Sequence, residues 1–222
     1  RFDMRIAVLG TGVAGRTLAG KLVALGHSVT IGSRSATNEA ATRWAAEAGP
    51  QAKAATFADA AADGEVVINA TPGAVSLKVL AAAGTRNLQG KVLLDVANPL
   101  DHSAGFPPTL SIANTDSLAE TIQRAFPAAR VVKALNTMRA DVMVAPEQLA
   151  GGDHDVFLAG DDVEAKDVVR RLLAEFGWRS EHIRDLGGLD AARGMEMWLP
   201  LWLRIFMSQG NNKAFNIKVV SG

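Results

Sequence analysis

A glycine-spaced turn near the N-terminus constrains the fold of this chain more than any other stretch. Residues Ile6 to Leu9 form a short apolar run, typical of a strand that is buried on both faces. Gly10, Gly12 and Gly15 complete a G-x-G-x-x-G pattern directly after it. The next residues have helical spacing, and Gly26 stands where a helix would end. The residues expected on one face of this helix are Val13, Leu18, Leu22 and Leu25.

The three glycines have separate physical roles in such a turn. Gly10 permits the tight reversal, Gly12 lets the backbone approach a pyrophosphate, and Gly15 lets the helix pack closely on the strand. The start of the helix, at Val13 and Ala14, supplies free N–H donors and a positive dipole end. With an apolar strand before the turn and a helix after it, the pattern predicts a dinucleotide site.

Strand and helix signals alternate along most of the chain, which predicts an α/β fold built on a doubly wound parallel Rossmann sheet. After Asp141 the rhythm changes to a small C-terminal α/β extension that ends in a long apolar helix from about Leu189. We therefore expect a nucleotide-binding domain over 1–140 and a small domain over 141–222. The expected strands are 4–9, 28–31, 52–56, 65–70, 91–96, 130–135, 156–159 and 182–186. The expected helices are 13–25, 36–48, 73–83, 117–125 and 163–176, besides the last one.

Composition excludes several classes of function. The 222 residues carry a formal net charge of zero and no basic tract, so nothing favours a nucleic-acid or anionic-membrane partner. Cysteine is absent, which excludes disulfides and thiolate catalysis and suits a cytoplasmic protein. Arg1 to Asp3 read as residues upstream of a start at Met4 rather than as a targeting segment. The apolar stretch 195–207 is too short and polar to span a bilayer and is expected to be a buried helix.

The end of the second expected strand favours NADP over NAD. An NAD-binding chain usually has Asp or Glu there to bind the adenosine ribose, whereas this chain has Ser33 and Arg34. A hydroxyl and a guanidinium suit a 2′-phosphate, which an acid would repel. The alternative is that Ser33 caps the next helix and Arg34 is a solvated surface charge.

Three further loops follow expected strands, at the edge where open α/β sheets bind ligands. The loop Ala70–Thr71–Pro72 is a candidate cofactor contact, although Thr71 as a helix N-cap with a first-turn proline would explain it without a ligand. Asn98 is a candidate contact or part of a plain turn. Asn136 and Thr137 fit two interpretations equally: polar groups that contact a ligand at the binding edge, or residues of a plain turn.

The remaining polar and aromatic residues are read as structural. Of the four histidines, His102 alone lies near the binding edge. No metal site is expected, because the aspartates between 153 and 162 are explained as turn residues and a helix start. Trp198 and Trp202 are expected in the core or at an interface, and the apolar last helix suggests a homodimer.

Taken together, these segments resemble the coenzyme F420-dependent NADP oxidoreductases. The resemblance rests on G-T-G-x-x-G with a following Leu-Gly-His turn, Ile-Gly-Ser-Arg at 31–34, Ala-Thr-Pro at 70–72, Val-Val-Lys-Ala-Leu-Asn-Thr at 131–137, Ala-Gly-Asp-Asp at 159–162 and Pro-Leu-Trp-Leu-Arg in the last helix. It extends over nearly the whole chain.

The resemblance implies residue roles in a site for two cofactors, NADP(H) and coenzyme F420. Thr11, Ser33 and Arg34 would hold the 2′-phosphate end, and Ala70 with Pro72 would line the nicotinamide half. The deazaflavin would meet three loop residues and a wall of the last helix. These residues are Asn136, Thr137 and Met138, with Leu199, Pro200 and Leu201 as the wall.

The resulting hypothesis is an oxidoreductase that moves a hydride between NADP(H) and F420, with Asn136 and Thr137 as candidate catalytic residues beside the ring. Stacking two flat rings needs little acid–base chemistry from the protein. Two alternatives stay open. One is an NADPH-dependent reductase with another acceptor, such as a flavin, a ferric chelate or an imine. The other is a non-catalytic NADP(H)-sensing module. Arg139, Arg193 and Lys213 are candidates for an acidic coenzyme tail.

Overall fold

The computed structural model describes residues 3–222, so the interpretation of Arg1 and Phe2 as upstream residues lies outside the described part of the chain. The strands are β1 (Arg5–Leu9), β2 (Ser28–Ser33), β3 (Ala52–Thr56), β4 (Val66–Asn69), β5 (Val92–Asp95), β6 (Leu100–Asp101), β7 (Thr109–Leu110), β8 (Arg130–Ala134), β9 (Val156–Gly160) and β10 (Ile183–Asp185). The α-helices are α1 (Val13–Ala24), α2 (Glu39–Ala48), α3 (Phe57–Asp63), α4 (Gly73–Ala83), α5 (Thr85–Leu88), α6 (Leu118–Ala125), α7 (Ala140–Val144), α8 (Val163–Phe176), α9 (Ala192–Met197) and α10 (Leu199–Ser208). Short 3₁₀ turns lie at Pro146–Gln148, Ala150–Gly152, Ser180–His182 and Leu189–Ala191.

Eight strands form one sheet in the order β10-β9-β8-β5-β4-β1-β2-β3. Strand β1 lies between β2 and β4, with Leu9 opposite both Gly32 and Asn69. Because these strands are parallel, their carboxyl ends meet at one edge of the sheet. The predicted α/β fold with a doubly wound parallel sheet is confirmed, apart from one pair: β9 runs antiparallel to β8.

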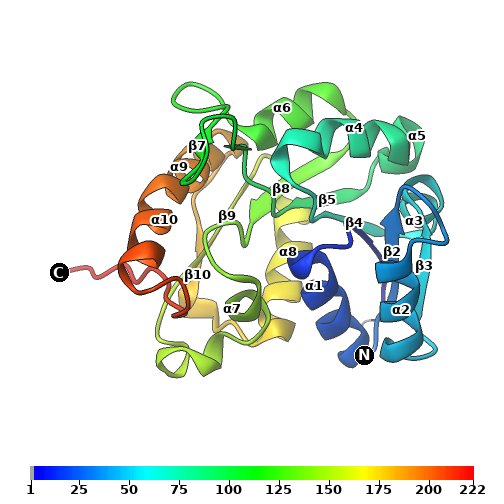
Figure 1. The fold of residues 1–222 in the computed structure, drawn as a ribbon, viewed down its shortest axis with the longest axis horizontal. Coiled ribbons are helices and arrows are strands. Elements are labelled where there is room, and N and C mark those ends of the chain that lie inside the picture. The colour runs from blue at the N-terminus through cyan, green and yellow to red at the C-terminus, as the bar shows by residue number, and fades with distance from the viewer. Residues whose placement is uncertain (1–2) are drawn as a thin grey trace.

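Helices cover the sheet on both faces, which makes three layers (Figure 1). One core joins the sheet to α1, α2, α7 and α8, and includes Leu18, Trp44 and Val169. The other core lies beneath α3, α4 and α6 and includes Leu80 and Ile122. The strands between these layers are buried on both sides, which explains their unbroken apolar sequences.

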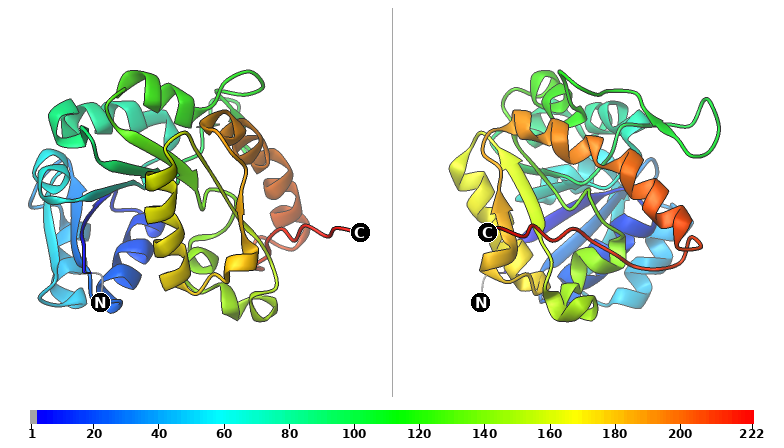
Figure 2. Two further views of the ribbon diagram at one scale, coloured as in Figure 1. Left: turned by 180° about the vertical axis from the view of Figure 1, so that it is seen from behind. Right: turned by 90° about the vertical axis from the view of Figure 1, so that its left-hand side faces the viewer.

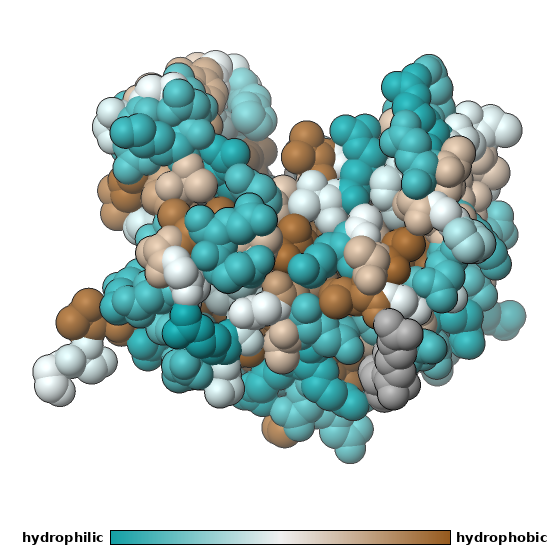
Figure 3. Space-filling view, turned by 90° about the horizontal axis from the view of Figure 1, so that it is seen from below, coloured by the Kyte–Doolittle hydropathy of each residue, from teal (hydrophilic) through white to brown (hydrophobic). Residues whose placement is uncertain are grey.

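The residues after 140 extend the same sheet by β9 and β10 and then pass into α9 and α10. Figure 2 shows α10 as a slanting helix on the outside of the molecule, with the C-terminal segment crossing the face beside β10. This segment is held by hydrogen bonds from the Asp155 N–H to the Ile217 carbonyl and from the Val219 N–H to the Asp155 carboxylate. Seen from below, two lobes rise on either side of a hollow (Figure 3).

Two local predictions about the first helices need correction. Helix α2 begins at Glu39 and not at Ala36, because the Asn38 side chain accepts the Ala41 N–H and caps the helix there. Val13 is 70% exposed and does not share the buried face of Leu18 and Leu22. Its place in the first turn of α1 puts it at the sheet edge, beyond the core.

The last apolar segment is also divided where a single long buried helix was expected. A 3₁₀ turn, α9 and α10 follow one another, and α10 starts at Leu199 with Pro200 in its first turn. Proline lacks an N–H and clashes with the preceding turn, so it favours a helix start at this point. Leu199 and Leu203 are buried, whereas Leu201 is 55% exposed.

Candidate functional site

A cavity of about 980 Å³ lies at the carboxyl ends of β1, β2, β4 and β5. Most of the residues predicted to bind the cofactor line it, which brings together loops that are far apart in the sequence. These residues are Gly10, Thr11, Gly12, Val13, Ala14, Ser33, Arg34, Ala70, Thr71, Pro72 and Asn98. Their contact with a cofactor stays a prediction.

The glycine turn leaves room for a ligand at one position and none at the two others. Gly10 has φ +120°, and a Cβ there would lie 2.5 Å from the Ala70 carbonyl oxygen. A Cβ on Gly15 would overlap the Gly10 carbonyl, so Gly15 serves the close packing of α1 and does not line the cavity. A Cβ on Gly12 would meet nothing within 4 Å. Gly12 is also the N-cap of α1 and has no side chain, so no capping side chain occupies the N–H groups of the first turn.

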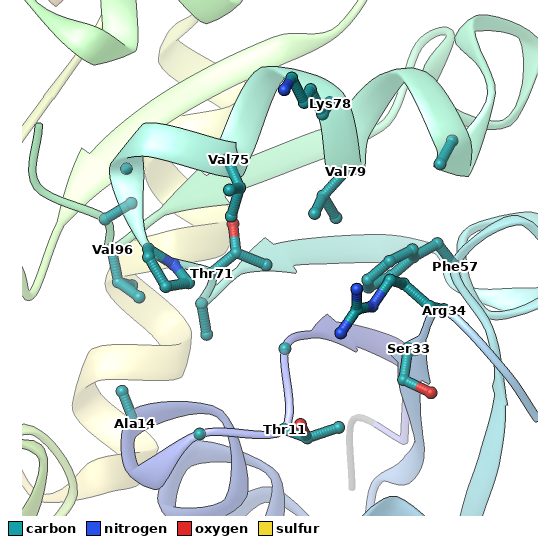
Figure 4. Close-up of a pocket in the computed structure, with 18 of the residues that line it drawn as sticks. Thr11, Ala14, Ser33, Arg34, Phe57, Thr71, Val75, Lys78, Val79 and Val96 are labelled. Atoms are coloured by element: carbon teal, nitrogen blue, oxygen red, sulfur yellow. The ribbon is translucent and has the colours of Figure 1, made fainter. Parts of the chain in front are cut away.

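The cavity carries positive charge without a compensating acid. Arg34 and Lys78 are its cations, and none of the described residues that line it is acidic. Figure 4 shows the Arg34 guanidinium beside Phe57, with Lys78 on α4 across the cavity. The Ser33 hydroxyl donates to the Ser35 carbonyl at 2.6 Å, and Asn38 caps α2, so the alternative of Ser33 as helix cap is wrong.

Phe57, Lys78 and Val79 line the cavity but were not expected from the sequence. Phe57 is the first residue of α3, a short helix whose sequence signals are the capping pair Thr56 and Asp59 at its start and Gly64 at its end. Lys78 and Val79 lie on α4, which was predicted, but the side of α4 that faces the cavity depends on how it packs on α3. Sequence periodicity does not contain that information.

The hydroxyl of Thr71 belongs to the framework of the site. It bonds to Asn69 Oδ1 at 2.6 Å and lies 3.0 Å from the Ser76 hydroxyl. Pro72, and not Thr71, is the N-cap residue of α4, so the interpretation of Thr71 as a capping side chain is wrong. Figure 4 shows this hydroxyl turned towards α4.

Asn136, Thr137 and Met138 are buried behind the cavity and do not line it. Leu135 before them has φ +64°, a conformation that a branched side chain rarely adopts and that turns the chain sharply at the end of β8. Asn98 and Asn136 exchange two hydrogen bonds: Asn136 Nδ2 donates to Asn98 Oδ1 at 2.9 Å, and Asn98 Nδ2 to the Asn136 carbonyl at 2.8 Å. Asn98 thus both lines the cavity and joins the two loops.

Two buried polar atoms in this loop have no hydrogen-bond partner among the described residues: Asn136 Oδ1 and Thr137 Oγ1. Buried polar atoms are almost always paired in native proteins, because an unpaired one costs about 1–3 kcal/mol. These two unpaired atoms are therefore candidates for hydrogen bonds to a bound ligand.

A second, apolar cavity of about 340 Å³ adjoins Thr137. It lies between β9, α9, α10 and the C-terminal segment, and it includes Leu201 of the predicted acceptor wall. Leu199 is buried and Pro200 is exposed, and neither lines either cavity. Trp198 also lines the second cavity and donates its indole N–H to the Thr137 carbonyl at 3.1 Å.

A fully buried ion triad stands between the two cavities. Lys133 Nζ lies 2.8 Å from Asp95 Oδ2 and 2.8 Å from Glu196 Oε1. Burial works against the charged form of Lys133, but the two carboxylates outweigh it and hold the pKa of Lys133 above its ordinary value. Burial also raises the pKa of Glu196, although Lys133 acts in the opposite direction.

Two of the three candidates for an acidic coenzyme tail are already engaged. Arg139 pairs with Asp141 and donates to the Asn212 carbonyl, and Arg193 pairs with Glu120. Lys213 is exposed. His102 is also exposed, in the loop between β6 and β7. Within residues 3–222 there is no group of three or more side chains that could hold a metal ion.

Comparison with known proteins identifies the family. The family described as NADP oxidoreductase, coenzyme F420-dependent, matches residues 5–99. The F420-dependent NADP reductase of Methanothermobacter marburgensis is 32% identical over 214 residues, which cover 91% of this chain and 92% of that protein. This chain belongs to the F420-dependent NADP reductase family. The predictions of this family and of an NADP-dependent oxidoreductase are confirmed.

A solved structure supports the same membership of the reductase family. It is provisionally described as an F420-dependent NADP reductase from Arthrobacter sp. FB24, and it is 51% identical, with a TM-score of 0.93 over 99% of this chain and 100% of that one. The rat metalloreductase STEAP3 is 30% identical over 202 residues, which cover 89% of this chain and 38% of that protein. This chain therefore spans well under half of the metalloreductase. Among the described residues of the chain, no helix is long and apolar enough to cross a membrane.

Proposed function

We propose that this protein transfers a hydride between NADP(H) and the deazaflavin coenzyme F420. The observation that carries the proposal is the pairing of two cavities across one loop. The larger contains a glycine turn open at Gly12 and the cation Arg34, and the smaller is apolar and adjoins Thr137. Asn136 joins the two linings, because it donates to Asn98 of the larger cavity and to the carbonyl of Met195 of the smaller one.

The residues of the larger cavity suit the two ends of NADP(H). Gly12 and the start of α1 would bind the pyrophosphate, since they line the cavity and no side chain caps the first N–H groups of the helix. Arg34 would bind the 2′-phosphate through charge-assisted hydrogen bonds, with Thr11 and Ser33 beside it. Ala70, Pro72 and Asn98 would line the nicotinamide half.

The residues behind this cavity would bind the acceptor. Asn136 and Thr137 would hydrogen-bond the deazaflavin through the unpaired Asn136 Oδ1 and Thr137 Oγ1, with the buried Met138 next to them in the same loop. Leu201, which lines the second cavity, would form the outer wall. In this view residues 141–222 act as the small domain that completes the acceptor pocket.

The proposed reaction depends on how the two coenzymes are positioned more than on proton transfer by the protein. When both coenzymes are bound, a hydride passes between C4 of the nicotinamide and C5 of the deazaflavin. The protein's task is to hold the two reacting carbons about 3 to 3.5 Å apart and to exclude water. Hydrogen bonds between Asn98 and Asn136 hold the two loops together, and histidine is absent from the described residues that line either cavity.

Spectrophotometry of NADPH oxidation by the purified protein tests the proposal. F420, FMN and FAD are offered separately, and NADH serves as the control donor. We expect turnover with NADPH and F420 only. Turnover with a flavin and not with F420 would overturn the proposal.

A second candidate function is reduction of a ferric chelate by NADPH, which the similarity to a metalloreductase favours. The same assay with ferric citrate decides between the two acceptors. Binding of NADPH without turnover of any acceptor would instead indicate a sensing module.

Two further properties belong to the proposal. We expect a homodimer, because Leu186, Met197 and Leu201 expose apolar surface beside the second cavity. Sedimentation equilibrium would measure the mass, and a monomer at micromolar concentration would contradict the dimer. We also expect the protein in the cytoplasm, because a chain without cysteine forms no disulfide and so needs no oxidising compartment.

A further inference from the structure

The Lys133 ammonium group connects the wall of the larger cavity to α9. Besides Asp95 and Glu196, it donates to the carbonyl oxygen of Ala97 at 2.5 Å. Ala97 lines the larger cavity, and Glu196 is a residue of α9. One buried side chain therefore ties a cofactor-facing loop to the helix that borders the second cavity.

A second route joins the same two segments through Asn136. This side chain donates to Asn98 Oδ1 at 2.9 Å and to the Met195 carbonyl at 3.1 Å. Ala97 and Asn98 are neighbours in the chain, and so are Met195 and Glu196. The two routes therefore close a ring that joins 97–98, Lys133, 195–196 and Asn136. We call it the loop-locking ring.

The loop-locking ring is anchored on both sides. Towards the cofactor, Asp95 Oδ1 accepts from Asn69 Nδ2 at 2.9 Å, and Asn69 holds Thr71. Towards the outside, Glu196 accepts the N–H groups of Leu118 and Ala119 at the start of α6, at 2.8 and 3.2 Å. The N–H groups at the start of α6 thus help to stabilise the negative charge of Glu196.

Nothing in the proposed hydride transfer uses these charges directly, since Asp95, Lys133 and Glu196 line neither cavity. Their contact with the lining is the hydrogen bond from Lys133 to the Ala97 carbonyl. Burying three charged groups is costly, and an apolar cluster would pack the same space without that cost. A hydrogen-bonded charge network does what an apolar cluster does not: it fixes the direction and distance between particular backbone groups.

We infer that the loop-locking ring is a positioning device that sets the separation between the nicotinamide loop at 96–98 and the acceptor loop at 135–138. Lys133 and Glu196 are thus positioning residues, acting through Ala97 and Asn136. The inference rests on the proposed function, because it assigns the two loops to the two partners of one transfer. Hydride transfer is sensitive to misplacement of about 1 Å, which can cost about 100-fold in rate.

Glu196→Gln tests the ring with little change in shape, because the amide can still accept the Leu118 N–H but no longer pairs with Lys133 as an anion. Asp185→Asn is the matched control: Asp185 also pairs with a buried lysine, Lys166, and accepts a backbone N–H from Gly187, but it lies on the edge strand β10, outside the ring and both cavity linings. For both variants we would measure NADPH affinity, the single-turnover rate with F420, and the isotope effect with deuterium at C4 of NADPH.

We expect Glu196→Gln to bind NADPH within about twofold of wild type, to transfer hydride about tenfold more slowly, and to show a more temperature-dependent isotope effect. Asp185→Asn should match wild type in all three. Equal single-turnover rates and isotope effects in the two variants would overturn the inference. If Glu196→Gln does not fold, Glu196→Asp, which keeps the charge and shortens the reach, is judged by the same criteria.

Amide hydrogen exchange separates failure of the ring from failure of the proposed function. If wild type does not reduce F420, the proposed function fails, and the ring is judged by exchange with NADPH bound. Glu196→Gln should then accelerate exchange about tenfold in both 96–99 and 135–138, whereas Asp185→Asn should accelerate neither. Acceleration in one segment alone would overturn the ring.

Discussion

Gly73 packs directly on the carbonyl group of Asn98, so that α4 starts against the neighbouring loop of the cavity. A Cβ on Gly73 would lie 2.6 Å from the Asn98 carbonyl carbon and would overlap its oxygen. Both contacts are with backbone, which cannot move aside as a flexible side chain can. Gly73→Ala should therefore destabilise the fold by about 1–3 kcal/mol, with a melting temperature lower by several degrees. Thermal unfolding without cofactor measures this, and an unchanged midpoint would contradict the contact.

Gly12 offers the opposite case, because the space around it is empty of protein. Gly12→Ala should leave the melting temperature of the free protein unchanged. With a pyrophosphate against the backbone, the added methyl would cost about 1–3 kcal/mol of overlap, which corresponds to a loss of about 5- to 150-fold in NADPH affinity. Titration of NADPH fluorescence measures the affinity. Equal affinity of Gly12→Ala and wild type would show that the pyrophosphate lies elsewhere.

Arg34 should determine the preference for NADPH over NADH. A charge-assisted hydrogen bond to a phosphate contributes about 1.5–3 kcal/mol, so Arg34→Ala should raise KM for NADPH by about 10- to 100-fold. KM for NADH should change little, because NADH has no 2′-phosphate. Arg43→Ala is the control, since Arg43 is an exposed partner of Glu39 on α2 and does not line the cavity. Equal effects of Arg34→Ala on both coenzymes would remove Arg34 from the phosphate site.

The sequence was sufficient for the glycine turn and the order of most elements, because these depend on local pattern. The strand Arg5–Leu9, the turn and α1 are all specified within one short segment. The place of Arg34 in the cavity lining could be predicted for the same reason, since it follows β2 directly. The cavity lining from these segments was therefore largely predictable.

The sequence was insufficient where long-range contacts decide the structure. Asn69 and Asp95 are 26 residues apart, and Asp95 and Lys133 are 38 apart, so no spacing rule connects them. The antiparallel direction of β9 depends on the path of the loop before it, which apolar periodicity does not describe. Asn136 was expected at the binding edge, but the sharp turn at Leu135 directs its side chain under the Asn98 loop.

The C-terminal segment should release in acid before the sheet unfolds. Burial alone would raise the pKa of Asp155, but the Val219 N–H, His182 and Arg184 stabilise its charged form and hold its pKa below the ordinary value. A carboxyl group with a lowered pKa contributes stability above its unfolded pKa, and this stability is lost as the pH falls through the folded value. We therefore expect the protection of the 216–219 amides, measured against an unstructured chain at the same pH, to fall below about pH 4. Asp155→Asn should show fast exchange already at pH 7 and should be about 2 kcal/mol less stable. A segment that stays protected at pH 3 would contradict this.

Thr137→Val should distinguish a role in binding the acceptor from a role in stabilising the fold, because it removes a buried hydroxyl that has no partner among the described residues. Valine keeps the shape of threonine, so the free protein should be as stable as wild type or about 1 kcal/mol more stable, as expected when an unpaired polar atom is removed. If that hydroxyl bonds to the acceptor ring, the rate with F420 should fall by about tenfold, the value of one hydrogen bond of about 1.4 kcal/mol. Thr30→Val, buried in β2 and outside both cavities, serves as the control. The two variants are compared by urea unfolding and by steady-state kinetics. Full activity of Thr137→Val together with raised stability would mean that the hydroxyl is an isolated defect in packing and that the acceptor lies elsewhere.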